Sequence, residues 1–163
     1  MIRKIAPLDA LSICNIYNYY ILNTAISFET EAVSEDEILR RIDEITTNCF
    51  PYYVYEVEGK VLGYCYLSPW KGRCAYRTTA EISIYIDKDY THQGIGIQLM
   101  KQLLDNVDNN RFHTIIAGIA LPNQGSVALH EKFGFTKISH FHEIGYKFGE
   151  WQDVGHWQLI LKK

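Results

Sequence analysis

The sequence has no long apolar run. No stretch approaches the roughly 18 consecutive apolar residues that a membrane-spanning helix needs. The first seven residues carry charge, but no apolar segment of a secretory signal follows them. These absences predict no membrane partner and a cytoplasmic location.

The net charge is small, and the chain has few cysteines. The formal net charge is −3, whereas nucleic-acid-binding domains usually carry a strongly basic surface, so no nucleic-acid partner is expected. The four cysteines, Cys14, Cys49, Cys65 and Cys74, form no C-x-x-C pair, which excludes a zinc ribbon and a dense disulfide framework. His140 and His142 are two apart and could share one face of a strand, but no third ligand is evident, so no metal is predicted.

What the chain does contain is typical of one globular domain. It has 163 residues, of which 47% are hydrophobic and 21% charged. A chain of this length buries enough surface to build its own core. Because no repeat, low-complexity tract or linker is visible, a single domain spanning residues 1–163 is predicted.

The hydrophobic pattern predicts an alternation of helices with a central run of strands. Ser34-x-x-Glu37 has the form of a capping box before a helix that runs to Thr47. Three strands in succession exclude the strict alternation of a Rossmann fold. The predicted class is α/β, with a mixed, mainly antiparallel twisted sheet and helices on both faces. Predicted strands are 2–6, 52–57, 61–67, 79–87, 113–120, 135–143 and 153–161, and the other predicted helices are 10–21, 97–109 and 123–133.

A glycine-containing loop, Thr91–Leu99, follows the predicted strand 79–87 and opens a helix. Glycines there let the backbone approach a ligand, and the helix N-terminus offers free N–H groups to a pyrophosphate. Leu99 stands where the Rossmann fingerprint has its third glycine, and the Lys-Ser/Thr of a P-loop is missing. Taken alone, the loop fits a tight turn as well as an anion site.

Three longer motifs carry a resemblance to a known family. They are Ala75-Tyr76-Arg77-x-Thr79-x-Glu81-x-Ser83-x-Tyr85, then Ser126-Val127-x-Leu129-His130-Glu131, and Gly145-Tyr146-Lys147-Phe148-Gly149-x-Trp151-x-Asp153-Val154-Gly155. With the glycine loop and Asn123, they resemble the GNAT superfamily of acetyl-CoA-dependent N-acetyltransferases, in its phosphinothricin acetyltransferase-like group. One departure is Thr91, where the family usually has Gln or Arg. The shorter side chain is expected to lose a phosphate contact while the backbone contacts remain.

The resemblance implies a direct attack of an amine on the thioester of acetyl-CoA, with no metal. It places Glu81 beside the acceptor amine as general base, and burial beside Ile82, Ile84 and Ile86 is expected to raise its pKa. It places His130 in a proton network with Glu81, and the direction of proton flow stays open. The backbone N–H groups of residues 84–86 are implied to stabilise the oxyanion.

The resemblance also implies two sets of binding residues, a small amine as substrate and a homodimer. For Phe28, as for Trp151, a place in the core is an equal alternative to a place in the pocket wall. The expected acceptor is the amino group of an amino-acid analogue of the phosphinothricin or methionine sulfoximine/sulfone type. The alternatives are a polyamine, an aminoglycoside or a protein N-terminus as acceptor, or a non-catalytic acyl-CoA sensor. The expected cofactor-binding residues are Ile84, Tyr85, Ile86, Thr91, His92, Gln93, Gly94, Ile95, Gly96, Asn123, Ser126 and Lys132, and the expected substrate-binding residues are Phe28, Arg73, Cys74, Ala75, Tyr76 and Arg77.

Overall fold

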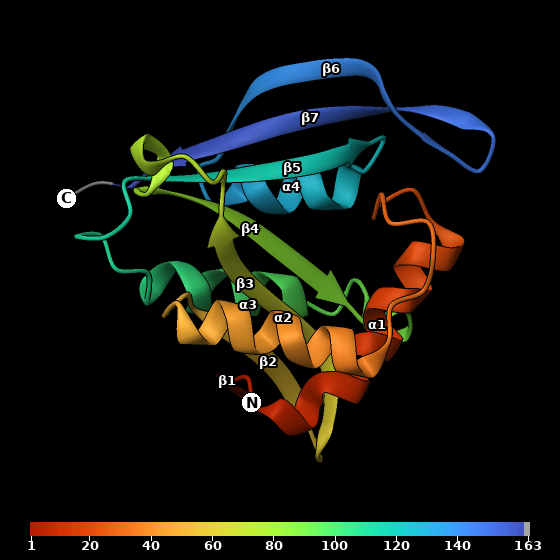
Figure 1. The fold of residues 1–163 in the computed structure, drawn as a ribbon, viewed down its shortest axis with the longest axis vertical. Helices are drawn as coiled ribbons and strands as arrows, with labels where there is room; N and C mark the ends of the chain where they lie inside the picture. Colours follow the sequence, from red (N-terminus) through yellow and green to blue (C-terminus); the bar gives the residue numbers. More distant parts are fainter. Residues whose placement is uncertain (162–163) are drawn as a thin grey trace. The chain divides into compact units, whose positions relative to one another are not determined.

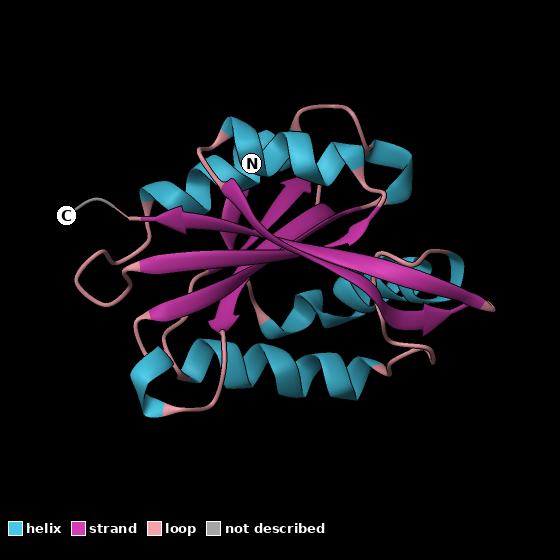
Figure 2. Ribbon diagram, turned by 90° about the horizontal axis from the view of Figure 1, so that it is seen from above, coloured by secondary structure: helices cyan, strands magenta, loops and turns pink. Residues whose placement is uncertain are grey.

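The computed structural model describes residues 1–161, which form seven β-strands and four α-helices (Figures 1 and 2). The strands are β1 (Ile2–Lys4), β2 (Tyr52–Val57), β3 (Lys60–Pro69), β4 (Thr79–Ile86), β5 (Thr114–Leu121), β6 (Thr136–Lys147) and β7 (Glu150–Ile160). The helices are α1 (Ala10–Asn23), α2 (Glu35–Thr47), α3 (Ile95–Asp105) and α4 (Gln124–Lys132).

The strand order is β1-β2-β3-β4-β5-β7-β6. β4 pairs with β5 in parallel, whereas the β1–β2, β2–β3, β5–β7 and β6–β7 pairs are antiparallel. The prediction of a mixed, mainly antiparallel sheet in an α/β fold is therefore confirmed.

The chain divides into two compact units. The first unit contains Met1–Tyr19, Glu31–Ser68 and Ser83–Val107, and the second contains Tyr20–Thr30, Pro69–Ile82 and the residues from Asp108 onward. Strand β4 contributes its first half to the second unit and its second half to the first. That residues 1–163 act as one domain stays a prediction.

In the first unit, α3 packs against β2 and buries one side of the sheet. Leu99, Met100 and Leu103 recur at helical spacing and are completely buried. Burial of each such side chain contributes about 1.5–3 kcal/mol to folding. The capping box predicted for α2 is confirmed in one of its two hydrogen bonds. The Oγ of Ser34 accepts a hydrogen bond from the Glu37 N–H at 3.1 Å.

In the second unit, α4 covers one face of β5 and β7. Trp157 of β7 is only 1% exposed, and its indole N–H donates to a carboxylate oxygen of Glu131 on α4 at 3.0 Å. Gly155 makes this packing possible, because a Cβ there would lie 2.5 Å from the Trp157 ring.

The last hairpin differs from the prediction. Residues 145–151 were expected to lie between two strands, but β6 runs on to Lys147 and β7 already begins at Glu150. Only Phe148 and Gly149 form the turn, with φ of 54° and 76°. Positive φ at both central residues is typical of a type I′ turn, which matches the twist of the strands it joins. α3 also ends at Asp105, earlier than the predicted Asn109.

A partly buried ion pair holds the N-terminal segment of the first unit. The carboxylate of Asp9 is 2% exposed and accepts two hydrogen bonds from the Arg3 guanidinium, both at 2.7 Å. Burial alone would raise the pKa of Asp9, but the bonds from Arg3 and from the Ala6 N–H outweigh it and leave the pKa below its usual value.

We expect Asp9→Asn to lower the free energy of unfolding by about 2 kcal/mol at pH 7, because the buried carboxylate loses its charge-assisted hydrogen bonds. A lowered pKa stabilises the fold above the unfolded-state pKa of about 4, and this contribution is lost as the pH falls through the folded-state pKa. The difference between the two proteins in urea unfolding should therefore shrink below about pH 4. Glu44→Gln, which breaks an exposed ion pair with Arg40, should have a much smaller effect. Equal effects of the two substitutions would contradict this role of Asp9.

Candidate active site

Glu81 lies on β4 opposite Ile116 of β5 and is half-buried. Burial raises the pKa of its carboxyl above the usual value, as the sequence predicted. Gly118 lies two residues beyond Ile116 and is exposed, whereas its neighbours Ala117 and Ile119 are buried. A Cβ on Gly118 would lie 3.4 Å from Oε1 of Glu81. The missing side chain therefore leaves an open place beside the carboxylate.

His156 of β7 also lies beside Gly118. It pairs with Gly118 across β5 and β7, and its Nε2 would lie 3.6 Å from a Cβ on Gly118. Its Nδ1 is 2.9 Å from the hydroxyl of Ser139, and the rings of Trp70 and Phe141 meet it edge-on. Burial, followed by the nearby positive charge of Lys71, lowers the pKa of His156. The carboxylate and the imidazole thus flank one exposed glycine.

His130 lies elsewhere, on α4. It is 2% exposed, and its Nδ1 is 2.8 Å from the carbonyl oxygen of Ser126. A carbonyl only accepts, so Nδ1 carries the proton. Nε2 is buried and has no hydrogen-bond partner within residues 1–161. Burial lowers the pKa of His130, and the bond to Ser126 offsets only part of this effect.

The alternation of β7 separates His130 from Glu81. Trp157, which faces α4, pairs with Ala117, whereas His156 pairs with Gly118 on the opposite face, where Glu81 lies. The described structure shows no hydrogen bond between Glu81 and His130. The proton network expected from sequence therefore includes no direct bond between these two residues, and it stays a prediction; His156, which sequence reasoning missed, is the histidine that shares the face of Glu81.

The glycine loop of the first unit has the backbone that an anion site needs. Gly94 caps α3 with φ of 78°, in the left-handed region, and no side chain caps the helix. No atom lies within 4 Å of the place that a Cβ on Gly94 would take. The first turn of α3 contains no acidic residue, so no carboxylate of this turn competes with an anion for its free N–H groups.

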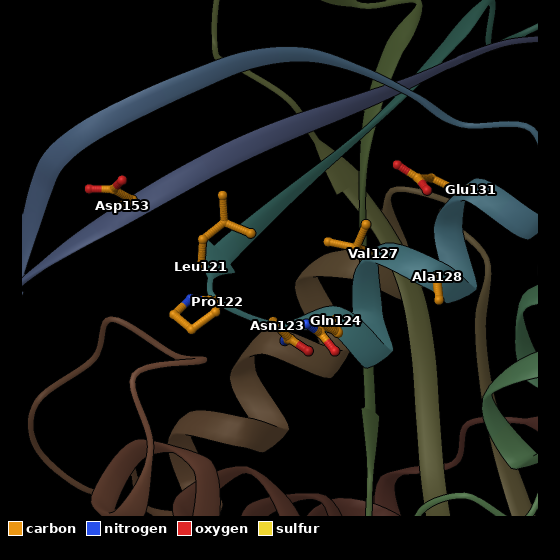
Figure 3. Close-up of a pocket in the computed structure, with 8 residues that line it drawn as sticks. All are labelled: Leu121, Pro122, Asn123, Gln124, Val127, Ala128, Glu131 and Asp153. Carbon is orange, nitrogen blue, oxygen red and sulfur yellow. The ribbon is translucent and has the colours of Figure 1, made fainter.

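The remaining predicted cofactor residues lie in both units. Thr91, His92 and Gln93 are exposed before α3, and the Thr91 hydroxyl donates to the carbonyl of Lys88 at 3.3 Å. The Tyr85 ring stacks on Tyr64 within the first unit. In the second unit, Asn123 accepts a hydrogen bond from the Ser126 N–H at 3.1 Å and so caps α4. Asn123 also lines a pocket of about 440 Å³ beside α4, which contains neither Glu81 nor His156 (Figure 3).

The predicted substrate residues all belong to the second unit. Arg73, Cys74, Ala75, Tyr76 and Arg77 form an exposed loop around a short 3-10 turn. A side-chain nitrogen of Arg77 lies 3.4 Å from the Cys74 carbonyl, so Arg77 supports the loop. Phe28, 42% exposed, packs against Gly145 of β6. Trp151, 61% exposed, contacts Tyr146 and is therefore no core residue.

Comparison with known proteins identifies the family. The family model "Acetyltransferase (GNAT) domain" matches residues 2–156. The chain belongs to the GNAT acetyltransferase family. As a GNAT enzyme it is an N-acetyltransferase whose co-substrate is acetyl-CoA. Within residues 1–161, no helix is both long and apolar enough to span a membrane.

Three known proteins are similar to this GNAT enzyme over nearly its whole length. It is 37% identical over 157 residues to phosphinothricin N-acetyltransferase of Streptomyces viridochromogenes, covering 96% of this chain and 85% of the relative. It is 32% identical over 160 residues to L-methionine sulfoximine/L-methionine sulfone acetyltransferase of Salmonella typhimurium, covering 98% and 94%. A solved GNAT superfamily phosphinothricin acetyltransferase from Sinorhizobium meliloti, in complex with acetyl-CoA, superimposes with a TM-score of 0.95 at 34% identity, covering 99% of this chain and 88% of that chain.

We expect His130 to be neutral at pH 7, with its proton on Nδ1 and a pKa below its ordinary value, because burial disfavours the imidazolium. Nitrogen-15 NMR of the imidazole during a pH titration measures both properties. Because the unfolded chain protonates this histidine more readily, His130 should also lower stability as the pH falls below about 6.5. A proton on Nε2 at pH 7, or a charged ring, would contradict this geometry.

Proposed function

We propose that this GNAT enzyme transfers the acetyl group of acetyl-CoA to the amino group of a small amino-acid analogue of the phosphinothricin or methionine sulfoximine/sulfone type. The observation that carries the proposal is the half-buried carboxylate of Glu81 with its raised pKa, beside the open place at Gly118. The names of the two similar curated proteins support this substrate class.

Glu81 would act as the general base. An amine with a pKa near 10 must lose a proton before it attacks, which costs about 4 kcal/mol at pH 7. A carboxylate with a raised pKa accepts that proton more readily than an exposed one. The role of acetyl-CoA is to supply the thioester carbon. The backbone N–H groups of residues 84–86, on the same strand as Glu81, would stabilise the oxyanion.

His130 would begin the reaction as a proton acceptor. Its Nδ1–H donates a hydrogen bond to the Ser126 carbonyl. In the neutral ring, only the lone pair of Nε2 can therefore accept a proton. The attacking nitrogen loses a second proton as the amide forms; His130 would accept this proton on Nε2 and pass it to the sulfur as the carbon–sulfur bond breaks.

Arg73 would bind the carboxylate of the acceptor. Its side chain is exposed and forms no hydrogen bond or ion pair among the described residues, whereas Arg77 is engaged with its own loop. A guanidinium recognises a carboxylate with two parallel hydrogen bonds. Two arginines in this loop disfavour a polyamine as acceptor.

A homodimer is proposed on the basis of the β6–β7 hairpin. This hairpin exposes a set of large apolar side chains, and exposed apolar patches are typical of interaction surfaces. The set consists of Ile138, Phe141, Ile144, Tyr146, Phe148 and Trp151.

We expect Glu81→Gln to lower kcat with phosphinothricin at least about 100-fold, the usual contribution of a general base, with an unchanged Kd for acetyl-CoA. In the unsubstituted enzyme, kcat/KM should rise with pH through the raised pKa of Glu81, and this limb should disappear in the variant. The matched control is Glu150→Gln, an exposed carboxylate of the same unit, with unchanged kinetics. Loss of acetyl-CoA binding in Glu81→Gln would contradict the role of Glu81 as general base.

We expect Gly94→Val to weaken acetyl-CoA binding at least about 10-fold, because a β-branched residue disfavours a φ of 78° and fills the space above the helix N-terminus. Isothermal titration calorimetry measures the Kd. Gly59→Val is the matched control: Gly59 has φ of 80° and equally open surroundings in the β2–β3 turn, so the variant suffers the same backbone strain. Equal affinities of both variants would show that the loop of Gly94 is only a turn.

A further inference from the structure

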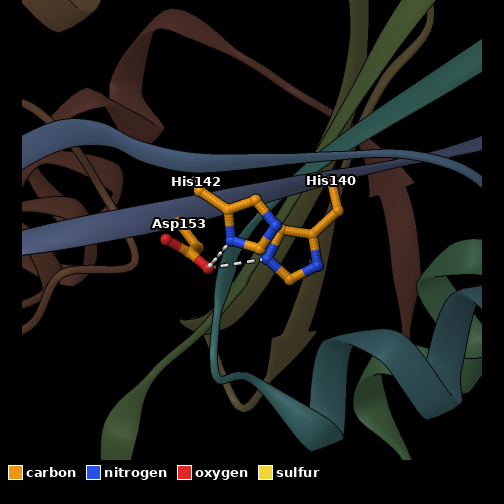
Figure 4. A group of neighbouring side chains, drawn as sticks. All are labelled: His140, His142 and Asp153. Atoms are coloured by element: carbon orange, nitrogen blue, oxygen red, sulfur yellow. Dashed lines mark hydrogen bonds and ion pairs between the residues drawn. The ribbon is translucent and has the colours of Figure 1, made fainter.

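Two histidines and an aspartate converge on the β6–β7 hairpin. His140 Nε2 lies 2.7 Å and His142 Nδ1 3.1 Å from the same oxygen of Asp153, Oδ2 (Figure 4). One ligand atom from each of the three residues lies within 4.8 Å of the other two. We propose that His140, His142 and Asp153 form a binding site for a divalent transition-metal ion such as Zn²⁺.

The backbone preorganises this cluster. His140 and His142 are two apart on β6 and so share a face of the strand. The register of the hairpin shifts between Phe141 and Gly145, which bends β6 around Asp153. Within this bulge Glu143 has φ of 53°, and its N–H donates to Oδ1 of Asp153 at 2.8 Å. That bond orients the carboxylate and leaves Oδ2 for the two imidazoles, in the manner of an outer-shell contact in metal sites.

The cluster lies at the surface of the hairpin. The two imidazole rings are 4.3 Å apart and nearly parallel. All three side chains are at least partly exposed, with side-chain exposures of 34%, 77% and 30% for His140, His142 and Asp153. In the single chain an ion can therefore reach them from solvent.

The donor set selects the class of ion. Two imidazole nitrogens and one carboxylate oxygen suit Zn²⁺, with water completing a tetrahedral shell. Ligands bonded at about 2.1 Å to one tetrahedral ion lie about 3.4 Å apart, close to the distances from Oδ2 of Asp153. Mg²⁺ and Ca²⁺ prefer an all-oxygen shell.

One positive charge opposes the ion. Lys137 Nζ lies 3.2 Å from Nδ1 of His140. The ammonium donates there, which places the proton of the neutral ring on Nε2, the atom that would bind the metal. Binding therefore requires a proton to leave or to move to Nδ1, and the exposed Lys137 side chain to turn away. No other side chain is bonded to the three ligands in the described hairpin. Lys137→Met should accordingly tighten binding.

The test is a calorimetric titration of the tag-free full-length protein with ZnCl₂ at pH 7.5. We expect one ion per chain, a Kd at least 10-fold weaker in His142→Ala and in Asp153→Asn, and a tighter Kd in Lys137→Met. Asp153→Asn keeps the acceptor for the Glu143 N–H, so the hairpin should remain folded. If it does not, His140→Ala replaces it. His113→Ala is the matched control, an exposed histidine outside the cluster, and MgCl₂ is the control ion.

Thermal unfolding gives a second readout. ZnCl₂ should raise the melting temperature of the unsubstituted protein and of His113→Ala, but not of His142→Ala, because only an ion bound to the folded hairpin stabilises it. Absence of zinc binding up to 100-fold molar excess would overturn the proposal. Undiminished stoichiometric binding in His142→Ala and Asp153→Asn would overturn it as well. The acetyl-transfer assay is not part of this test, so the outcome is independent of the proposed substrate.

Discussion

The pairing of β5 with β7 decides which side chains of the second unit meet. Because side chains alternate along a strand, His156 opposite Gly118 requires Trp157 opposite Ala117 on the other face. Trp157 anchors α4 through its hydrogen bond to Glu131, while His156 lies on the same face as Glu81, beside Gly118. A slip of one residue in this register would exchange the two faces. The packing of α4 and the candidate acetyl-transfer face therefore depend on the same ladder of hydrogen bonds.

Two glycines allow this ladder to serve both purposes. Gly155 leaves room for the indole of Trp157, and Gly118 keeps the face of Glu81 open. A side chain at the first position would displace a completely buried aromatic ring, and at the second it would fill the space between a carboxylate and an imidazole. The first glycine acts on the stability of the fold, and the second on access to the proposed base.

Sequence reasoning succeeded where the signal is local. The Ser34 cap and the loop at Gly94 each follow from a few neighbouring residues, and the burial of Glu81 follows from its apolar neighbours on one strand. It failed where a contact depends on register between distant strands. His156 is 75 residues from Glu81 in the chain, and Asp153 completes the histidine pair only through the bulge in β6. The turn at Phe148 was missed because a bulky residue with positive φ leaves no local signal.

The histidines of the second unit show how the partner atom decides the chemistry of an imidazole. The carbonyl of Ser126 accepts only, so it fixes the proton of His130 on Nδ1 and turns a lone pair into the buried space. The hydroxyl of Ser139 both donates and accepts, so it leaves both tautomers open to His156. The carboxylate of Asp153 bonds to His140 and His142 alike. One divalent ion between them would replace both hydrogen bonds, because it would bind the same nitrogen and oxygen atoms that now form them.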